Sequence, residues 1–139
     1  MLVDIQGTSR KKTSLIRKVI EYMMNELKLK NIFIDVEVSN LFVNEKAYGF
    51  CSCQNKTEFL IELDQTLNVQ ELIETICHEM IHVKQYATGE LVEKGKKILY
   101  KNCLYESSSD SSPWEKEAYE KEIIFADKFI NTFGIMQHS

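Results

Sequence analysis

The pentapeptide His78-Glu79-Met80-Ile81-His82 is the part of the chain whose residue types and spacing are best suited to chemistry. Positions i and i+4 of a helix lie on one face, one turn apart, so His78 and His82 can bind one metal ion from the same side. Glu79 is adjacent, where its carboxylate can accept a proton from water held at that ion. The chain has 3 histidines, and this motif contains two of them. We therefore predict a metal site with His78 and His82 as ligands and Glu79 as the catalytic base.

The motif lies in a segment that has a clear helical pattern and a clear start. Asn68 and Glu71 have the spacing of a capping box, and no proline or glycine interrupts the pattern before Gly89. We predict a helix that ends at about Tyr86 or Ala87. Its expected buried stripe is Leu72, Ile73, Ile76, Met80 and Val83. A second face is expected to line a cleft and carries Thr75, His78, Glu79, His82 and Tyr86.

A third metal ligand is needed, because catalytic zinc usually has three protein ligands and keeps one position for water. The last helix, expected over 113–133 with Ser112 as N-cap, offers several glutamates. Glu115 is in capping-box position, which assigns it to the start of that helix. We predict Glu117 as the third ligand, because it lies clear of the cap and precedes Ala118, a small residue that allows close helix packing.

Other candidates for the third position are weaker. Glu120, on nearly the same helix face as Glu117, is the alternative glutamate. His138 lies in the last two residues of the chain and Asp110 lies in a serine-rich loop, so neither is expected to be a fixed ligand.

The 4 cysteines are expected to be reduced thiols rather than a disulfide framework. Cys77 adjoins His78 but points about 100° away on a helix, so it is expected in the core. Cys51 and Cys53 would share one face of a strand, a closer spacing than zinc pairs usually have. Cys103 is the most credible thiol alternative for the third ligand.

The predicted chemistry is hydrolysis. Bound Zn²⁺ lowers the pKa of water to about 7, and Glu79 accepts the proton as the water attacks a carbonyl. A second donor to the resulting oxyanion is usual, and the candidates are Tyr86, Tyr100, Tyr105 and Tyr119. The strand Thr57–Asp64 precedes the motif helix, and an exposed edge there would pair with an extended peptide; the alternative is an ordinary central strand.

The remaining patterns predict one α+β domain over residues 1–139 with a small three-stranded, mostly antiparallel sheet. The expected elements are a helix over 13–29, strands over 32–38, 47–53 and 57–64, and a short hairpin over 97–106. Gly49 is expected to mark a bulge or a point of close approach. Residues 1–12 and 134–139 are expected to be loose tails, and 106–110 a polar loop.

Composition narrows the class of protein. The chain is 44% hydrophobic and 27% charged, which is typical of a globular protein. No apolar run is long enough for a membrane span, and the first residues have no secretory h-region, so we predict a cytoplasmic protein without a membrane partner. The net charge of −4 argues against a mainly nucleic-acid-binding role. A local basic cluster at Arg10, Lys11, Lys12, Arg17 and Lys18 is expected to be a solvated helix start.

The segment from Tyr48 to Tyr86 resembles the zincin metallopeptidases and looks like the core of the small SprT-like proteins. It covers roughly the middle third of the chain, and its one sharp motif is HExxH. SprT-like enzymes take a third histidine downstream, and this chain has none in place. Residues 113–118, Pro-Trp-Glu-Lys-Glu-Ala, are instead similar to the Glu-Ala element of gluzincins, in which the glutamate binds zinc. The resemblance implies a zincin-like fold, Glu117 as ligand, and a compact gluzincin of the kind found in bacteria and phages.

Three functions compete. The first is a zinc-dependent metallopeptidase that acts on a peptide or protein substrate. The second is a peptide deformylase, whose cysteine ligand lies in a Glu-Gly-Cys segment that is missing here. The third is a non-catalytic zinc-binding or peptide-binding regulatory domain with a structural or vestigial site. Because the third ligand differs, the DNA-linked roles of SprT-like proteins are not expected.

Overall fold

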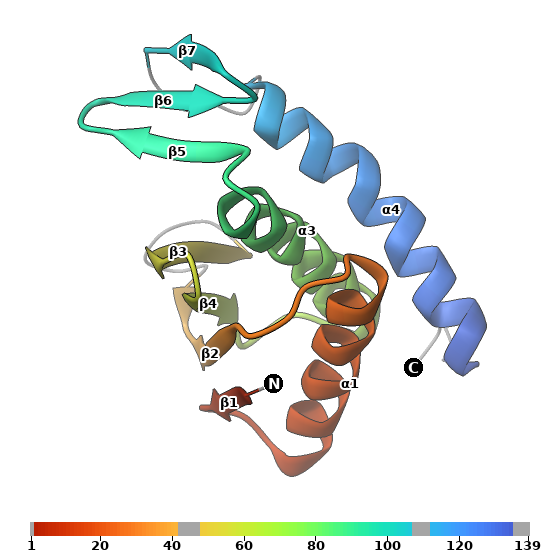
Figure 1. Cartoon of the computed structure of the whole chain (residues 1–139). Helices are drawn as coiled ribbons and strands as arrows, with labels where there is room; N and C mark the ends of the chain where they lie inside the picture. The colour runs from red at the N-terminus through yellow and green to blue at the C-terminus, as the bar shows by residue number, and fades with distance from the viewer. Residues whose placement is uncertain (1, 42–47, 107–111, 135–139) are drawn as a thin grey trace.

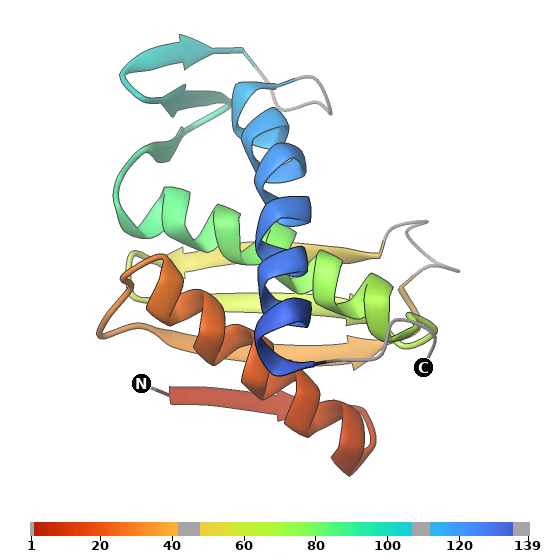
Figure 2. The ribbon, with the colours of Figure 1, turned by 90° about the vertical axis from the view of Figure 1, so that its right-hand side faces the viewer.

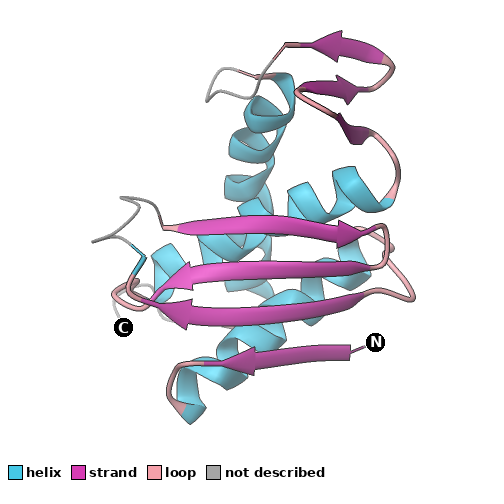
Figure 3. Cartoon of the chain, turned by 90° about the vertical axis from the view of Figure 1, so that its left-hand side faces the viewer, coloured by secondary structure: helices cyan, strands magenta, loops and turns pink. Residues whose placement is uncertain are grey.

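A computed structural model describes residues 2–41, 48–106 and 112–134 (Figure 1). The strands are β1 (Leu2–Gln6), β2 (Phe33–Ser39), β3 (Gly49–Asn55), β4 (Glu58–Asp64), β5 (Leu91–Lys94), β6 (Lys97–Tyr100) and β7 (Cys103–Tyr105). The helices are α1 (Arg10–Glu26), α3 (Val69–Ala87) and α4 (Pro113–Phe133). These helices lie on the same side of the four-stranded sheet, as Figure 2 and the opposite view in Figure 3 show: α1 and α3 cover the sheet, and α4 packs on α3 in an outer layer. The fold is α+β, as predicted.

The main sheet differs from the prediction. It has 4 strands in the order β1-β2-β4-β3, and it is mixed: β1 and β4 pair with β2 in parallel, and β3 pairs with β4 in antiparallel orientation. The expected three-stranded, mostly antiparallel sheet was wrong in two respects: residues 2–6 form β1 instead of a loose tail, and two of the predicted strands, β2 and β4, pair in parallel. A parallel pair such as β1 and β2 needs the crossover through α1, so a local pattern of five residues does not reveal it.

Strands β2 and β4 are the interior strands of this sheet, so β4, the strand that precedes the motif helix, has no free edge. The sheet face toward the helices buries alternate residues of β2 and β4, among them Ile34, Val36, Phe59, Ile61 and Leu63. All five residues of the predicted stripe of α3 are buried against this face, which fixes the helix to the sheet. The free edge beside α3 belongs to β3.

A second sheet of 3 antiparallel strands, β5-β6-β7, follows α3. The predicted hairpin is confirmed as β6 and β7, joined at Lys101 and Asn102, which both have positive φ as a type I′ turn requires. Strand β5 was not predicted, because it is only 4 residues long and adjoins a lysine-rich turn. A small apolar cluster of Leu91, Tyr100 and Trp114 joins this sheet to α4.

The basic cluster at the start of α1 is only partly solvated. The Nζ atom of Lys12 lies 3.3 Å from the backbone oxygens of both Gln65 and Leu67, and Arg17 donates to the oxygen of Val3 at 2.9 Å. Two of these cations therefore hold loops and strands together.

Some predictions fall outside the described part of the chain. Residues 107–111 contain most of the predicted polar loop, 135–139 contain most of the predicted C-terminal tail, and Ala47 is the predicted start of a strand. Among the described helices, none combines the length and the apolar character needed to cross a bilayer.

Gly49 is a point of close approach, one of the two roles predicted for it. A Cβ atom there would lie 2.8 Å from Cγ2 of Thr75 on α3 and 2.9 Å from the backbone oxygen of Glu62 on β4. The register shift in β3 occurs later, between Cys53 and Asn55. The missing side chain at Gly49 thus lets the edge strand lie directly on the motif helix.

We expect Gly49→Ala to lower the free energy of unfolding by about 1–3 kcal/mol, because the added methyl group overpacks the contact between β3 and α3. Urea unfolding measures the change. The control is Ser52→Ala in the same strand, which should change stability by less than about 0.5 kcal/mol. Equal stability of the two variants would contradict the close packing at Gly49.

Candidate metal centre

Helix α3 sets the position of the two histidines. Its start is fixed by the predicted capping box: Asn68 Oδ1 accepts from the Glu71 N–H at 2.8 Å, and Glu71 Oε1 accepts from the Asn68 N–H at 3.0 Å. From this start, His78 and His82 fall one turn apart on the side of α3 that meets α4. Their ring centroids are 4.9 Å apart. The motif therefore presents two imidazoles to the second helix.

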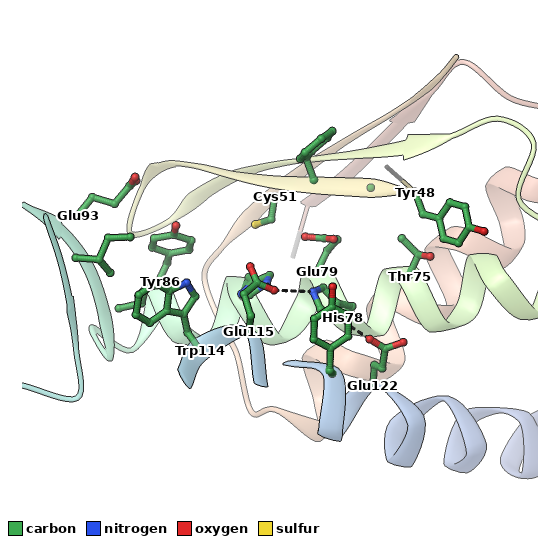
Figure 4. A pocket seen from close by; sticks show the side chains of 16 residues that line it. Tyr48, Cys51, Thr75, His78, Glu79, Tyr86, Glu93, Trp114, Glu115 and Glu122 are labelled. Carbon is green, nitrogen blue, oxygen red and sulfur yellow. Dashed lines mark hydrogen bonds and ion pairs between the residues drawn. The ribbon is translucent and has the colours of Figure 1, made fainter. Parts of the chain in front are cut away.

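The carboxylate of Glu115 on α4 joins both imidazoles. Its Oε1 atom lies 3.2 Å from Nε2 of His78, a contact that Figure 4 shows, and 3.2 Å from Nε2 of His82. Ligand atoms at zinc distances of about 2.0–2.1 Å in a tetrahedron are about 3.3 Å apart, so both spacings match edges of a zinc coordination shell. Two imidazole nitrogens and one carboxylate oxygen are also a donor set that catalytic zinc uses. These residues fit a zinc ion by spacing and by chemistry.

The outer nitrogens of both rings have acceptors that orient them. Nδ1 of His78 lies 2.8 Å from Oε1 of Glu122, and Nδ1 of His82 lies 2.9 Å from Oε1 of Gln85. An ionised carboxylate only accepts, so the His78 Nδ1 must carry the hydrogen, and in the neutral ring the Nε2 lone pair faces Glu115. Such outer partners are usual for metal-binding histidines.

Glu79 is a buried carboxylate that faces the same cavity (Figure 4). It is 6% exposed, and it makes no hydrogen bond or ion pair with the described residues. Burial raises its pKa, and the nearby His82 and His78 act in the opposite direction. Among the described residues, no fully enclosed side-chain oxygen or nitrogen lacks a hydrogen-bond partner, so the Glu79 oxygens are open to the cavity and can accept from a polar species that enters it.

The structure does not place Glu117 with the two histidines, which corrects the prediction of the third ligand. Glu117 Oε1 accepts from Tyr100 Oη and from Gln85 Nε2, both at 2.7 Å, and Oε2 accepts from Lys121 Nζ at 2.7 Å. Glu120, the alternative, is exposed. The group that could hold a metal, within the described residues, consists of His78, His82 and Glu115.

Two features of α4 explain the error. The expected capping box is not formed, since α4 has no side-chain cap hydrogen bond from Ser112, and Glu115 turns to the histidines instead. The sequence carried one signal that was missed: Glu115 and Glu122 are seven residues apart, which places both carboxylates on one helix face, and both contact His78. Glu122 and Gln85 were not predicted as parts of the site.

The metal group opens into a cleft with a volume of about 610 Å³. Its walls are the edge strand β3, helix α3, helix α4 and the β5-β6 end of the second sheet. Of the four candidate tyrosines, Tyr86 and Tyr119 line this cleft, and the Tyr119 ring lies 4.7 Å from that of His78. Tyr100 instead donates to Glu117, and Tyr105 packs on Trp114.

The cysteines do not complete the metal group. Cys103, the thiol alternative, is exposed on β7 and does not line the cleft. Cys77 is buried in the core, as predicted, and burial raises its pKa to about 12. Cys51 lines the cleft, but it is not part of the described group that could hold a metal, and burial raises the pKa of its thiol well above the ordinary range.

Without a metal, the site favours protons on the imidazoles. Burial alone would lower the pKa of His78, but hydrogen bonds with Glu115 and Glu122 outweigh it and raise the pKa to about 10. The pKa of His82 is also raised, against the effect of burial, mainly by the hydrogen bond with Glu115. Burial opposes ionisation of Glu115, but the two imidazoles lower its pKa to about 2. The carboxylates therefore stabilise positive charge at this position.

Comparison of the chain with protein-family models, curated proteins and solved structures finds no match. The support for a metal centre is therefore the geometry of His78, His82 and Glu115.

We expect Glu115→Ala to weaken zinc binding more than about 100-fold, because it leaves two ligands where catalytic zinc needs three. Competition with a chromophoric chelator measures the affinity. Glu120→Ala removes an exposed carboxylate from the same helix and should leave the affinity unchanged. The assignment of Glu115 would be wrong if the two variants bound zinc equally well.

The metal-free chain should become less stable as the pH rises from 6.5 to 10. A base whose pKa is raised in the folded chain adds its full stability below the unfolded pKa, 6.5 for His78, and loses it as the pH rises through the folded pKa of about 10. Urea unfolding in the presence of a chelator measures this slope. The double variant His78→Asn/His82→Asn should have a shallower slope, whereas a flat or rising stability of the unsubstituted chain would contradict the raised pKa values.

Proposed function

We propose that this protein is a zinc-dependent peptidase in which His78, His82 and Glu115 hold the metal and Glu79 is the general base. The observation that carries the proposal is the convergence of the three donor atoms beside the buried carboxylate of Glu79, which makes no hydrogen bond with the described residues. All four side chains line one open cleft. This arrangement supports both parts of a hydrolytic site, a metal centre and a base.

Each side chain has a distinct task in peptide hydrolysis. Zinc, when bound, supplies a Lewis acid that polarises the scissile carbonyl and acidifies water. Glu79 takes the proton from the attacking water and passes it to the leaving nitrogen. Burial, followed by the charge of Glu93, raises the pKa of Tyr86, so its hydroxyl remains protonated and can donate to the developing oxyanion. Tyr119 also lines the cleft, with its ring 4.7 Å from that of His78.

The edge of β3 is suited to hold an extended peptide. Strand β3 is the last strand of the sheet, and Tyr48, Gly49, Phe50 and Cys51 line the cleft. Free backbone groups of an edge strand pair with a peptide strand, and neighbouring pockets then select its side chains. The proposed peptide-binding strand is thus β3. It is not β4, the strand before the motif helix, which the sequence had suggested as one of two alternatives.

The charge of the cleft favours some peptides over others. Its lining includes Glu79, Glu93, Glu115 and Glu122, and none of the described lining residues is Lys or Arg. One bound divalent cation offsets only part of this charge. Peptides with basic or apolar side chains are therefore favoured over acidic peptides.

A purely structural zinc is less well supported. Structural zinc sites usually have four protein ligands and are closed to solvent. The described group offers three ligands and opens into the cleft. The free fourth position is what a catalytic zinc requires.

We expect Glu79→Gln to abolish peptide hydrolysis and to retain zinc, because the amide keeps the size of the side chain but cannot accept the proton. Cleavage of a quenched fluorescent peptide library measures the activity, and metal analysis measures the zinc. Glu62→Gln, on a strand of the sheet outside the cleft lining, is the control and should retain activity. Full turnover by the Glu79→Gln variant would exclude Glu79 as the base.

A further inference from the structure

Gln85 is a fully buried amide one turn beyond His82, the last residue of the motif, and its orientation is fixed by its partners. Its Nε2 atom lies 3.1 Å from the backbone oxygen of Trp114 and 2.7 Å from Oε1 of Glu117. A carbonyl and a carboxylate only accept, so both contacts require the amide nitrogen as the donor. The amide oxygen must therefore face His82, where it lies 2.9 Å from Nδ1.

This orientation determines the tautomer of His82. Because an amide oxygen only accepts, Nδ1 of His82 must carry the hydrogen, and Nε2 of the neutral ring is left with its lone pair toward Glu115. A reversed amide would set its NH₂ group against Nδ1 and its oxygen against two acceptors. The Trp114 oxygen and the Glu117 carboxylate together thus determine which ring nitrogen of His82 is available to a metal.

Glu117 is held in turn by the second sheet and by its own helix. Tyr100 on β6 donates to Oε1, and Lys121 donates to Oε2, each at 2.7 Å. Tyr100 is 6% exposed and packs on Trp114, with ring centroids 5.7 Å apart. Three hydrogen bonds in series therefore connect the second sheet to the ring of His82: Tyr100 to Glu117, Gln85 to Glu117, and His82 Nδ1 to Gln85.

We infer that Tyr100, Glu117 and Gln85 form a positioning relay through which the second sheet fixes the tautomer of His82 and strengthens metal binding. The inference rests on the proposed zinc site but goes beyond it. In this relay Glu117 is not a metal ligand. It acts on the ligand His82 through two hydrogen bonds, by way of Gln85. The relay also makes the two histidines unlike: His78 is backed directly by the carboxylate of Glu122, and His82 by a neutral amide that a carboxylate orients.

Zinc affinity, measured on the full chain by chelator competition, tests the relay. We expect Gln85→Leu to weaken binding about 10-fold to 100-fold, the usual effect of losing an outer partner of a metal ligand. Glu117→Gln and Tyr100→Phe should weaken it less, because the Trp114 oxygen still holds the amide of Gln85. The matched control is Tyr105→Phe, which removes a hydroxyl from the same apolar cluster without touching Glu117 and should leave the affinity unchanged.

A double-variant cycle separates a relay from general damage. If Glu117 acts through Gln85, Glu117→Gln should have no further effect on zinc affinity in the Q85L background. Additive effects, or unchanged affinity in folded Tyr100→Phe and Glu117→Gln, would overturn the relay. If the unsubstituted chain bound no zinc at all, the proposed function itself would fail instead.

A second measurement needs no Gln85 variant. In the zinc-loaded, unsubstituted chain, ¹⁵N NMR of the histidine rings should show the hydrogen of His82 on Nδ1. Glu117→Gln should shift the Nδ1 resonance of His82 and leave that of His78 in place, since Glu122 holds His78 independently. A hydrogen on Nε2 of His82, or equal shifts of both rings, would contradict the relay.

Discussion

The contact between one carboxylate of α4 and two imidazoles of α3 is the interaction around which the site is organised. Glu115 Oε1 reaches both Nε2 atoms at 3.2 Å only if the two helices lie very close together. Ala118, fully buried and one turn further along α4, leaves room for that approach. The sheet supports α3 from its other side through the buried apolar stripe. The spacing of the three side chains therefore depends directly on the close packing of α3 and α4.

The charges around this contact explain why a cation belongs there. Three carboxylates, those of Glu79, Glu115 and Glu122, surround two imidazoles in a partly buried space. Ionised carboxylates at this density repel one another unless positive charge lies between them. Protonated imidazoles supply it in the metal-free chain, and in the proposed zinc site a divalent metal would supply it with neutral imidazoles. Under that proposal, proton and metal compete for the same position, which would link metal affinity to pH.

Several features that depend on local residue patterns were predicted correctly from the sequence. The start of α3 followed from the Asn68–Glu71 capping box, and its buried stripe from helical periodicity. The two histidines and Glu79 came with that helix, because spacing alone sets their common face. Strand β1 was missed because its pairing depends on a crossover, and β5 because it is too short to show a pattern. The position of Glu115 beside the two histidines was missed, because it depends on how α4 is rotated about its axis.

That rotation is set by a contact that lies far from the motif in the sequence but borders the same cleft. Adjacent helical residues are about 100° apart, so Glu115 and Glu117 lie on opposite sides of the line through Trp114 and Ala118. Trp114 is 3% exposed and packs into the second sheet with Leu91 and Tyr100, which fixes this line against both α3 and β6. One glutamate then meets the histidines, and the other meets Tyr100 and Gln85. The second sheet thus determines which glutamate faces the two histidines. The sequence pattern had predicted only its β6–β7 hairpin.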